Sequence, residues 1–309
     1  MWSGVNKPAV LKRRIPFLEN LNTNLIAYLS SIMLRLMKTI LSIQSQVSFG
    51  AVGNTLATMV AGVMNSDIAT INTISLIAHP GYGIRAGGAT NDDDMAAMLD
   101  AISALDLWDH IGMVTTGYMA RAEQVRLTRD AIDAGKAITP LSVLIDPAFG
   151  DHGRHYNDTS IAHAIRDQLL PVADLITPNR FEASFLSDID ITDAASATAA
   201  GQALLADYPQ MSAVIITGIV QDKSCTDILI QSDHIRQHNA PRLAHNANGF
   251  AGGGDLFASL LSGYHMQGHD MDVAFAKTAD QTARILSHLD KQKKRDITRQ
   301  AIVACLETI

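Results

Sequence analysis

The stretch Gly112-Met113-Val114-Thr115-Thr116, followed by residues 120–134 and then by Leu141-Ser142-Val143-Leu144-Ile145, decides the fold of this chain. The two short runs are apolar and bounded by turn residues, which is typical of buried strands. The segment between them carries its apolar residues at helical spacing. A helix between two such strands forms a βαβ unit, which joins parallel strands of one sheet.

The same alternation continues from Thr39 to the C-terminus. We predict strands at residues 39–43, 71–77, 112–116, 141–145, 175–177, 214–217 and 226–230. We predict helices at residues 54–64, 92–105, 120–134, 160–169, 194–206, 254–264, 273–288 and 298–306. The sequence therefore indicates an α/β fold with a mainly parallel central sheet flanked by helices on both faces, in one domain spanning residues 37–309.

Composition narrows the class of protein. The 309 residues are 47% hydrophobic and 18% charged, with a net charge of −7, as in an ordinary globular protein. The negative charge argues against an extended surface for nucleic acid or an anionic membrane. Cys225 and Cys305 have no metal-ligand spacing and cannot form a disulfide framework, so a reducing, cytoplasmic setting is expected.

Residues 1–36 differ from the rest, because they are basic and lack the alternation of strands and helices. Their apolar stretch at residues 25–34 is too short for a membrane span. A signal peptide would need small residues just beyond it, where Arg35 and Lys38 stand. We therefore expect an N-terminal extension, or a start assigned upstream of a true start at Met37, in preference to a targeting segment.

Polar residues follow several of the predicted strands. Open α/β sheets bind ligands beyond the carboxyl ends of their strands, so these positions are candidate site residues. The alternative is that strands simply become polar where they end. The candidates, in chain order, are Gln44, Ser45, His79, Tyr118, Asp146, Asn179 and Glu182.

A glycine cluster supplies the strongest local signal, in Asn248-Gly249-Phe250-Ala251-Gly252-Gly253-Gly254-Asp255-Leu256-Phe257. It leads into a predicted helix, whose free N–H groups and positive dipole end attract anions such as a phosphoryl group. Asp255 in the first turn could then remove a proton from an attacking alcohol. The alternative is a loop in which Asp255 caps the helix. Neither the P-loop pattern nor G-x-G-x-x-G is present, which disfavours P-loop enzymes and NAD dehydrogenases.

A second candidate site lies in Thr177-Pro178-Asn179-Arg180-Phe181-Glu182. Asn179 and Glu182 can share one face of a helix start and hold Mg²⁺ through its waters. The alternative is that Glu182 only caps the helix. Asp146 and Asp151 add two carboxylates after a strand. The histidines at 152, 155 and 163 match no common zinc spacing.

Taken in order, these motifs resemble the pyridoxal kinases of the ribokinase superfamily, from about Met37 to the C-terminus. The matching segments are residues 43–54, 76–83, 117–118, 146–151, 176–183 and 252–261. Two positions depart from the family pattern. Gln46 replaces the usual histidine, and Ile77-Ala78-His79-Pro80 stands where the family has Ser-Asn-His-Thr. Loss of the threonine hydroxyl at Pro80 is expected to alter substrate preference.

The resemblance implies a ribokinase-like fold and a role for each candidate residue. Asp255 would be the catalytic base, and the amides of Gly252, Gly253 and Gly254 would form an anion hole. Asn179 and Glu182 would organise Mg²⁺ and the ATP phosphates, with Asp146 and Asp151 nearby, and Thr217 and Gly218 would touch the nucleotide. Ser45, His79 and Tyr118 would line the vitamin pocket, with Tyr156 approaching from a mobile flap.

The predicted function is therefore ATP- and Mg²⁺-dependent phosphorylation of the 5′-hydroxymethyl group of pyridoxal, or of pyridoxine or pyridoxamine. The resemblance further implies a homodimer and allows for K⁺ as an assisting cation. Two alternatives stay open. One is a hydroxymethylpyrimidine kinase of the same fold, and the other is a protein that binds pyridoxal phosphate without catalysis.

Overall fold

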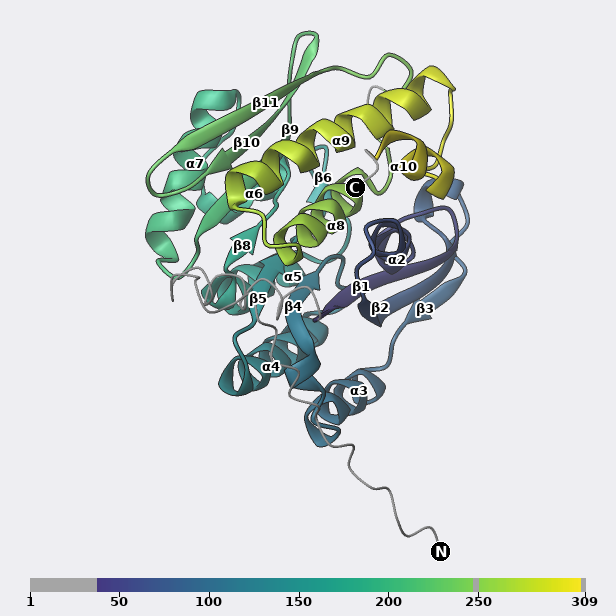
Figure 1. The fold of residues 1–309 in the computed structure, drawn as a ribbon, viewed down its shortest axis with the longest axis vertical. Helices are drawn as coiled ribbons and strands as arrows, with labels where there is room; N and C mark the ends of the chain where they lie inside the picture. The colour runs from purple at the N-terminus through teal and green to yellow at the C-terminus, as the bar shows by residue number, and fades with distance from the viewer. Residues whose placement is uncertain (1–37, 247–249, 307–309) are drawn as a thin grey trace, which may run out of the picture.

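The structure is a computed structural model that describes residues 38–246 and 250–306 (Figure 1). Its centre is a nine-stranded sheet with the order β11-β10-β9-β8-β5-β4-β1-β2-β3. Neighbouring strands from β9 through to β2 are parallel, while β3, β10 and β11 are antiparallel to their neighbours. The strands are β1 (Thr39–Phe49), β2 (Ile68–Ala78), β3 (Gly87–Ala89), β4 (Ile111–Thr116), β5 (Ser142–Ile145), β8 (Leu175–Ile176), β9 (Ala213–Gln221), β10 (Ser224–Ile230) and β11 (Ile235–Pro241).

The central strands read as continuous apolar runs because both of their faces are covered. Successive side chains point to opposite faces, so Leu144 of β5 packs in one hydrophobic core while Val143 and Ile145 pack in the other. The same division holds in β1, where Ile40 faces one core and Leu41 the other. This burial on two sides makes the sheet the middle layer of the molecule.

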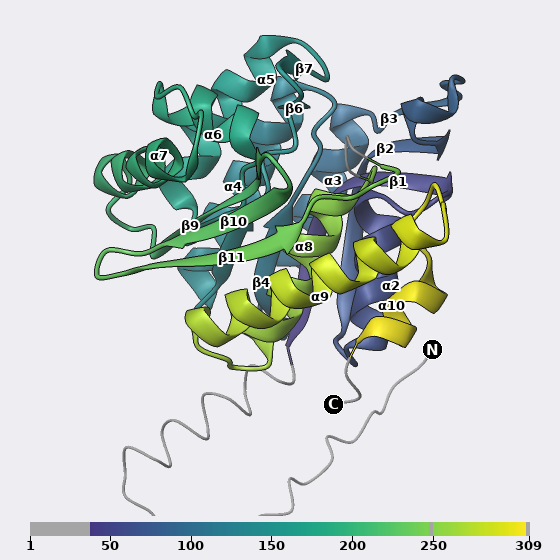
Figure 2. The ribbon, with the colours of Figure 1, turned by 90° about the horizontal axis from the view of Figure 1, so that it is seen from above.

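Helices cover the two faces in separate sets (Figure 2). One set consists of α2 (Gly53–Val63), α8 (Gly253–Met266), α9 (Met271–Lys291) and α10 (Arg299–Cys305). The other consists of α3 (Asp92–Ala104), α4 (Ala122–Ile138), α5 (Thr159–Ala164), α6 (Arg180–Ser187) and α7 (Ala194–Asp207). The first set encloses the core that contains Leu144, and the second set encloses the core that contains Val143. The predicted three-layer α/β arrangement is confirmed.

The strand boundaries differ from prediction in ways that matter for the site. β1 runs on to Phe49, so Gln44 and Ser45 lie inside this strand, at an irregularity of its pairing with β2, and not after it. Thr217 and Gly218 likewise lie inside β9. Strands β3 and β11 and the small hairpin of β6 (Gly150–Asp151) and β7 (Arg154–His155) lie outside the predicted strands.

β11 shows why a strand can escape prediction. Its sequence, Ile235-Arg236-Gln237-His238-Asn239-Ala240-Pro241, has no apolar run, and its side chains are exposed or half-buried. It forms because its backbone pairs with β10 along the sheet edge. The predictions for residues 1–36, and for Asn248 and Gly249, fall outside the described residues. Among the described helices, none combines the length and the apolar character needed to cross a membrane.

Candidate active site

The glycine turn places Asp255 at the start of α8. Gly252 has a φ of +86°, a left-handed conformation that favours glycine, and α8 begins at the next residue. The first bond of the helical ladder runs from the Leu256 N–H to the Gly252 carbonyl at 2.8 Å. The N–H groups of Gly254 and Asp255 lie ahead of that bond and have no intrahelical acceptor. The Gly253 N–H, by contrast, donates to the Phe250 carbonyl at 3.0 Å.

Asp255 does not cap its own helix. Its Oδ2 accepts a hydrogen bond from the backbone N–H of Gly53, at the start of α2, at 2.9 Å. Gly53 has a φ of +54°, and a methyl group on it would come within 2.1 Å of the Ser45 carbonyl oxygen and 2.4 Å of Ser45 Oγ. Only glycine therefore fits here, and Ser45 lies directly beside the turn that holds Asp255.

Three carboxylates gather beyond the sheet. Asp146, which follows β5, is buried, and a methyl group on Gly254 would lie 3.8 Å from its Oδ2. Burial is the main reason that the pKa of Asp146 is raised well above its usual range, and the nearby charges of Glu182 and Asp255 add to it. Burial also raises the pKa of Asp255, while its bond from Gly53 opposes that rise. Burial therefore disfavours the charged forms of these carboxyl groups, and a bound cation would favour them.

Asn179 and Glu182 form a reciprocal capping box at the start of α6. The Glu182 N–H donates to Asn179 Oδ1 at 3.1 Å, and the Asn179 N–H donates to Glu182 Oε2 at 2.9 Å. Glu182 Oε1 accepts a further bond from the Gly150 N–H at 3.3 Å. The capping interpretation of the sequence is therefore confirmed. Burial nevertheless raises the pKa of Glu182 to about 8, because the backbone donors offset desolvation only in part.

The carboxylates suit a hard divalent cation in type, since Mg²⁺ prefers carboxylate and amide oxygens and keeps several waters. No group of three or more His, Cys, Asp or Glu side chains within residues 38–246 and 250–306 is arranged to bind a metal directly. The buried charge on Asp146 and Glu182 fits an ion bound through water, together with a phosphate ligand.

The predicted nucleotide residues of β9 adjoin α6. Thr217 forms an isolated bridge with Asn179, and its N–H donates to the Pro178 carbonyl at 3.0 Å. Gly218 has a φ of +73°, and its N–H donates to Oδ1 of Asp227 at 2.9 Å. Thr217 therefore lies beside Asn179, and Gly218 adopts a left-handed conformation at the next position of β9.

The predicted pocket residues Tyr118 and Tyr156 approach from another side. Tyr118 packs against the small core cluster at the ends of β1 and β2, and its hydroxyl oxygen accepts a bond from Asn157 Nδ2. Tyr156, which follows the hairpin of β6 and β7, is 52% exposed. Its pKa is raised by partial burial and by the negative charges of Asp151 and Glu182. The hairpin therefore brings Asp151 and Tyr156 to the carboxylate group.

His79 directly follows β2 and contacts residues 292–298, between α9 and α10, which we refer to as the C-terminal loop. Its Nδ1 accepts from the Gly81 N–H at 3.2 Å, and its Nε2 is 3.7 Å from Asp296 Oδ1. Arg295 also reaches this segment, since its guanidinium lies 3.8 Å from the centre of the Tyr82 ring. Arg295, the last residue of the basic run at residues 291–295, therefore makes a structural contact.

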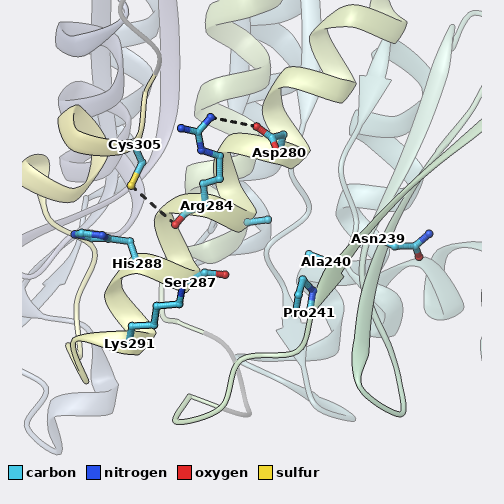
Figure 3. Close-up of a pocket in the computed structure, with 10 residues that line it drawn as sticks. Asn239, Ala240, Pro241, Asp280, Arg284, Ser287, His288, Lys291 and Cys305 are labelled. Carbon is cyan, nitrogen blue, oxygen red and sulfur yellow. Dashed lines mark hydrogen bonds and ion pairs between the residues drawn. The ribbon is translucent and has the colours of Figure 1, made fainter.

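A pocket of about 430 Å³ lies elsewhere, between β11, α9 and α10 (Figure 3). Arg284, His288 and Lys291 line one side of it, and Cys305 donates a weak bond to the Arg284 carbonyl at 3.9 Å. None of the predicted site residues lines this pocket. The acidic candidate site at the carboxyl ends of the strands is the better place for the chemistry.

Sequence reasoning did not assign a role to three contacts of the site: the Gly53 N–H, the Asn157 amide, and the pair Arg295 and Asp296. Gly53 lies in residues 43–54, one of the segments that resemble the pyridoxal kinases, and this resemblance could have pointed to it. The other contacts join segments far apart in the chain, such as Tyr82 and Asp296, and carry no local pattern.

Comparisons with known proteins agree on one family. The family model described as phosphomethylpyrimidine kinase matches residues 69–297. A pyridoxal kinase of Arabidopsis thaliana is 30% identical over 231 residues, covering 73% of each chain. A pyridoxal kinase of Rubrobacter xylanophilus is 27% identical over 277 residues, covering 87% of this chain and 93% of the relative.

Solved structures give the same result. Pyridoxal kinase from Leishmania donovani, in complex with ADP and pyridoxine, superposes with a TM-score of 0.75 at 27% identity, covering 85% of this chain and 90% of that one. Pyridoxal kinase from Entamoeba histolytica, at 21% identity, has a TM-score of 0.77 over 88% of this chain and 98% of that one, which supports the fold. This chain is a kinase with the ribokinase-like fold, and it belongs to the pyridoxal kinase family.

Proposed function

We propose that this chain transfers the γ-phosphoryl group of ATP to the 5′-hydroxymethyl group of pyridoxal or a related B6 vitamer. The observation that carries the proposal is the position of Asp255 in the first turn of α8. Its carboxylate is held by a hydrogen bond from the Gly53 N–H and lies close to Asp146. The relatives support the substrates, since the Leishmania donovani enzyme was solved with ADP and pyridoxamine and with ADP and pyridoxine.

Asp255 acts as the general base. Its carboxylate takes the proton of the vitamin alcohol as the alcohol oxygen attacks the γ-phosphorus. Burial raises the pKa of this carboxyl group, which makes it a stronger base, while the hydrogen bond from the Gly53 N–H opposes that rise and orients the carboxylate. The bond from the γ-phosphorus to the β,γ-bridging oxygen breaks, and ADP leaves.

The glycine turn stabilises the negative charge that develops on the transferring group. The Gly254 N–H is proposed as the main donor of this anion hole, because the Gly253 N–H already donates to the Phe250 carbonyl. Gly252 contributes the left-handed conformation of the turn. Asn179, Glu182, Asp146 and Asp151 are proposed to orient Mg²⁺ and the phosphates through water. Mg²⁺ supplies neutralisation of the triphosphate charge when bound.

Ser45, Tyr118, His79 and Tyr156 are proposed to surround the vitamin ring, and Thr217 and Gly218 to contact the nucleotide. We further propose a homodimer, a cytoplasmic setting and assistance by a monovalent cation such as K⁺. The family resemblance supports the homodimer and the cation, and the absence of a disulfide at Cys225 and Cys305 is compatible with the setting.

A hydroxymethylpyrimidine kinase is the second candidate function. The matching family model is described as phosphomethylpyrimidine kinase, which names a substrate with a related pyrimidine ring, and Pro80 stands where pyridoxal kinases have a threonine. Incubation with ATP and, in parallel, with pyridoxal, pyridoxine, pyridoxamine and hydroxymethylpyrimidine separates the two. Formation of the 5′-phosphate of a B6 vitamer is the expected result. Turnover of the pyrimidine alone would contradict the proposal, and turnover of none would favour a binding protein.

A further inference from the structure

The segment that follows β2, residues 79–83, has little to hold it in place by itself. We refer to it as the His79 loop. Its short helix η2 (Pro80–Tyr82) buries no residue, and its internal bonds are few. They are the Gly81 N–H to His79 Nδ1, the Tyr82 N–H to the His79 carbonyl and the Gly83 N–H to the Pro80 carbonyl. A loop of this kind keeps a fixed position only if other parts of the chain hold it.

Two consecutive residues of the C-terminal loop supply that contact. The Tyr82 hydroxyl donates to Asp296 Oδ2 at 2.6 Å, and the Arg295 guanidinium stacks on the Tyr82 ring at 3.8 Å. Arg295 also donates to the Gly81 carbonyl. His79 Nδ1 accepts a hydrogen bond, so its proton in the neutral ring sits on Nε2, which faces Asp296 Oδ1 at 3.7 Å.

The C-terminal loop is itself firmly anchored. Ile297 is buried, and the buried carboxylate of Asp290 accepts hydrogen bonds from the N–H groups of residues 244–246. The N–H of Lys294 donates to the Leu289 carbonyl at 3.0 Å. Arg295 and Asp296 therefore lie between the end of α9 and the buried Ile297. The end of α9 also binds residues 244–246, which precede the glycine turn.

The same residues lie next to the turn that positions Asp255. A methyl group on Gly50 would come within 3.3 Å of Asp296 Oδ1 and 3.8 Å of the His79 ring. Gly50 begins the short connection to Gly53, whose N–H binds Asp255. Asp296 therefore contacts the His79 loop and lies beside the turn at residues 50–53.

We propose that Arg295 and Asp296 are positioning residues that hold the His79 loop against the turn at residues 50–53, and so keep His79 in place at the vitamin pocket. The inference rests on the proposed function, in that His79 is taken to line the vitamin pocket. It extends that function to residues of the C-terminal loop that lie outside the pocket itself.

The test compares Arg295→Ala and Asp296→Ala with Lys294→Ala, which removes a positive charge from the same loop but leaves the His79 loop contacts in place. Loss of these contacts is expected to raise the KM for pyridoxal about tenfold, the effect of one lost charge-assisted hydrogen bond. The KM for ATP and the kcat should stay near wild type. Asp296→Asn, which keeps an acceptor for the Tyr82 hydroxyl, should restore most of the pyridoxal KM. An unchanged pyridoxal KM in Asp296→Ala, or an equal rise in the ATP KM, would overturn the proposal.

Amide hydrogen exchange without substrate gives a readout that does not depend on which alcohol is phosphorylated. The N–H groups of Tyr82 and Gly83 should exchange faster in Asp296→Ala than in wild type or Lys294→Ala. Unchanged exchange would refute the positioning role. Inertness of the wild type toward all three vitamers would instead refute the proposed function while leaving the exchange result to stand by itself.

Discussion

The Asp255 carboxylate accepts a hydrogen bond from the backbone N–H of Gly53, a residue 202 positions earlier in the chain, at 2.9 Å. The bond joins the starts of α2 and α8, two helices that pack on the same face of the sheet. It fixes the proposed base to a backbone group, whose position changes less than that of a side chain.

Asp255→Asn should lower kcat by about 10²- to 10⁴-fold, the usual contribution of a general base. The amide oxygen of asparagine can still accept the Gly53 N–H, so the fold and ATP binding should be retained. Steady-state kinetics and ATP titration check this, with Asp100→Asn on the exposed face of α3 as the matched control. Unchanged turnover in Asp255→Asn would show that Asp255 is not the general base.

The glycines of the turn should respond differently to alanine. Gly252→Ala should lower the free energy of unfolding by about 1–2 kcal/mol or more, because Gly252 has a left-handed φ. A methyl group there would also meet the Ala51 carbonyl oxygen at 2.5 Å. Gly254→Ala should keep or raise stability, since its methyl group has room and alanine favours helix.

Despite that stability, Gly254→Ala should reduce kcat/KM, because the methyl group would lie on the side of the proposed anion hole, 3.8 Å from Asp146 Oδ2. Urea unfolding and kinetics on both variants separate the two effects. A fully active Gly254→Ala enzyme would argue against an anion hole at this turn.

Glu182→Gln should change how stability depends on pH. Burial raises the pKa of Glu182 from 4.5 to about 8, so its protonated form is the one that favours folding. Its contribution is complete below about pH 4.5 and is lost as the pH rises through about 8. Glutamine removes the charge but keeps only one of the two oxygens that accept the N–H groups of Asn179 and Gly150, so the variant loses one bond at every pH. Its Tm relative to that of wild type should therefore rise from pH 5 to pH 8.5.

Thermal denaturation across this pH range checks the prediction, with Glu123→Gln as the control, because hydrogen bonding from Arg126 lowers the pKa of Glu123. Added Mg²⁺ should narrow the Tm difference at high pH if the ion is held near Glu182. A Tm difference that is flat with pH would show that the Glu182 carboxyl titrates normally.

Asn54→Ala should be destabilising by about 2–4 kcal/mol, since it would leave several buried groups without partners. The side chain of Asn54 is fully buried. Its Nδ2 donates to Asn72 Oδ1 at 2.8 Å and to the Gln44 carbonyl at 3.2 Å, and its Oδ1 accepts from Ser42 Oγ at 2.8 Å. Urea denaturation measures the loss, and Gln202→Ala on the exposed face of α7 should show almost none. A loss below about 1 kcal/mol would mean that water replaces these bonds.

Much of this architecture could be read from local pattern. The apolar runs of β4 and β5 and the helix between them predicted a parallel sheet, because strands buried on both faces need apolar residues at every position. Asp146 and the pair Asn179 and Glu182 were found for a related reason, since parallel strands bring their carboxyl ends to one edge. The capping box of Glu182 was also readable, as its geometry is local.

By itself, the sequence determined the α/β fold and the acidic residues at the strand ends, since both follow from periodicity and spacing along the chain. Only the tertiary structure decided which groups hold them: the Gly53 N–H at Asp255, Asn157 at Tyr118, and Arg295 and Asp296 at the His79 loop. It also decided that β9 runs on past Thr217 through Gly218, and that β11, which has no apolar run, forms a strand by pairing with β10. The physical reason for the contacts at Asp255, Tyr118 and the His79 loop is that they join segments distant in sequence, whose partners meet only after the sheet and its helices have packed.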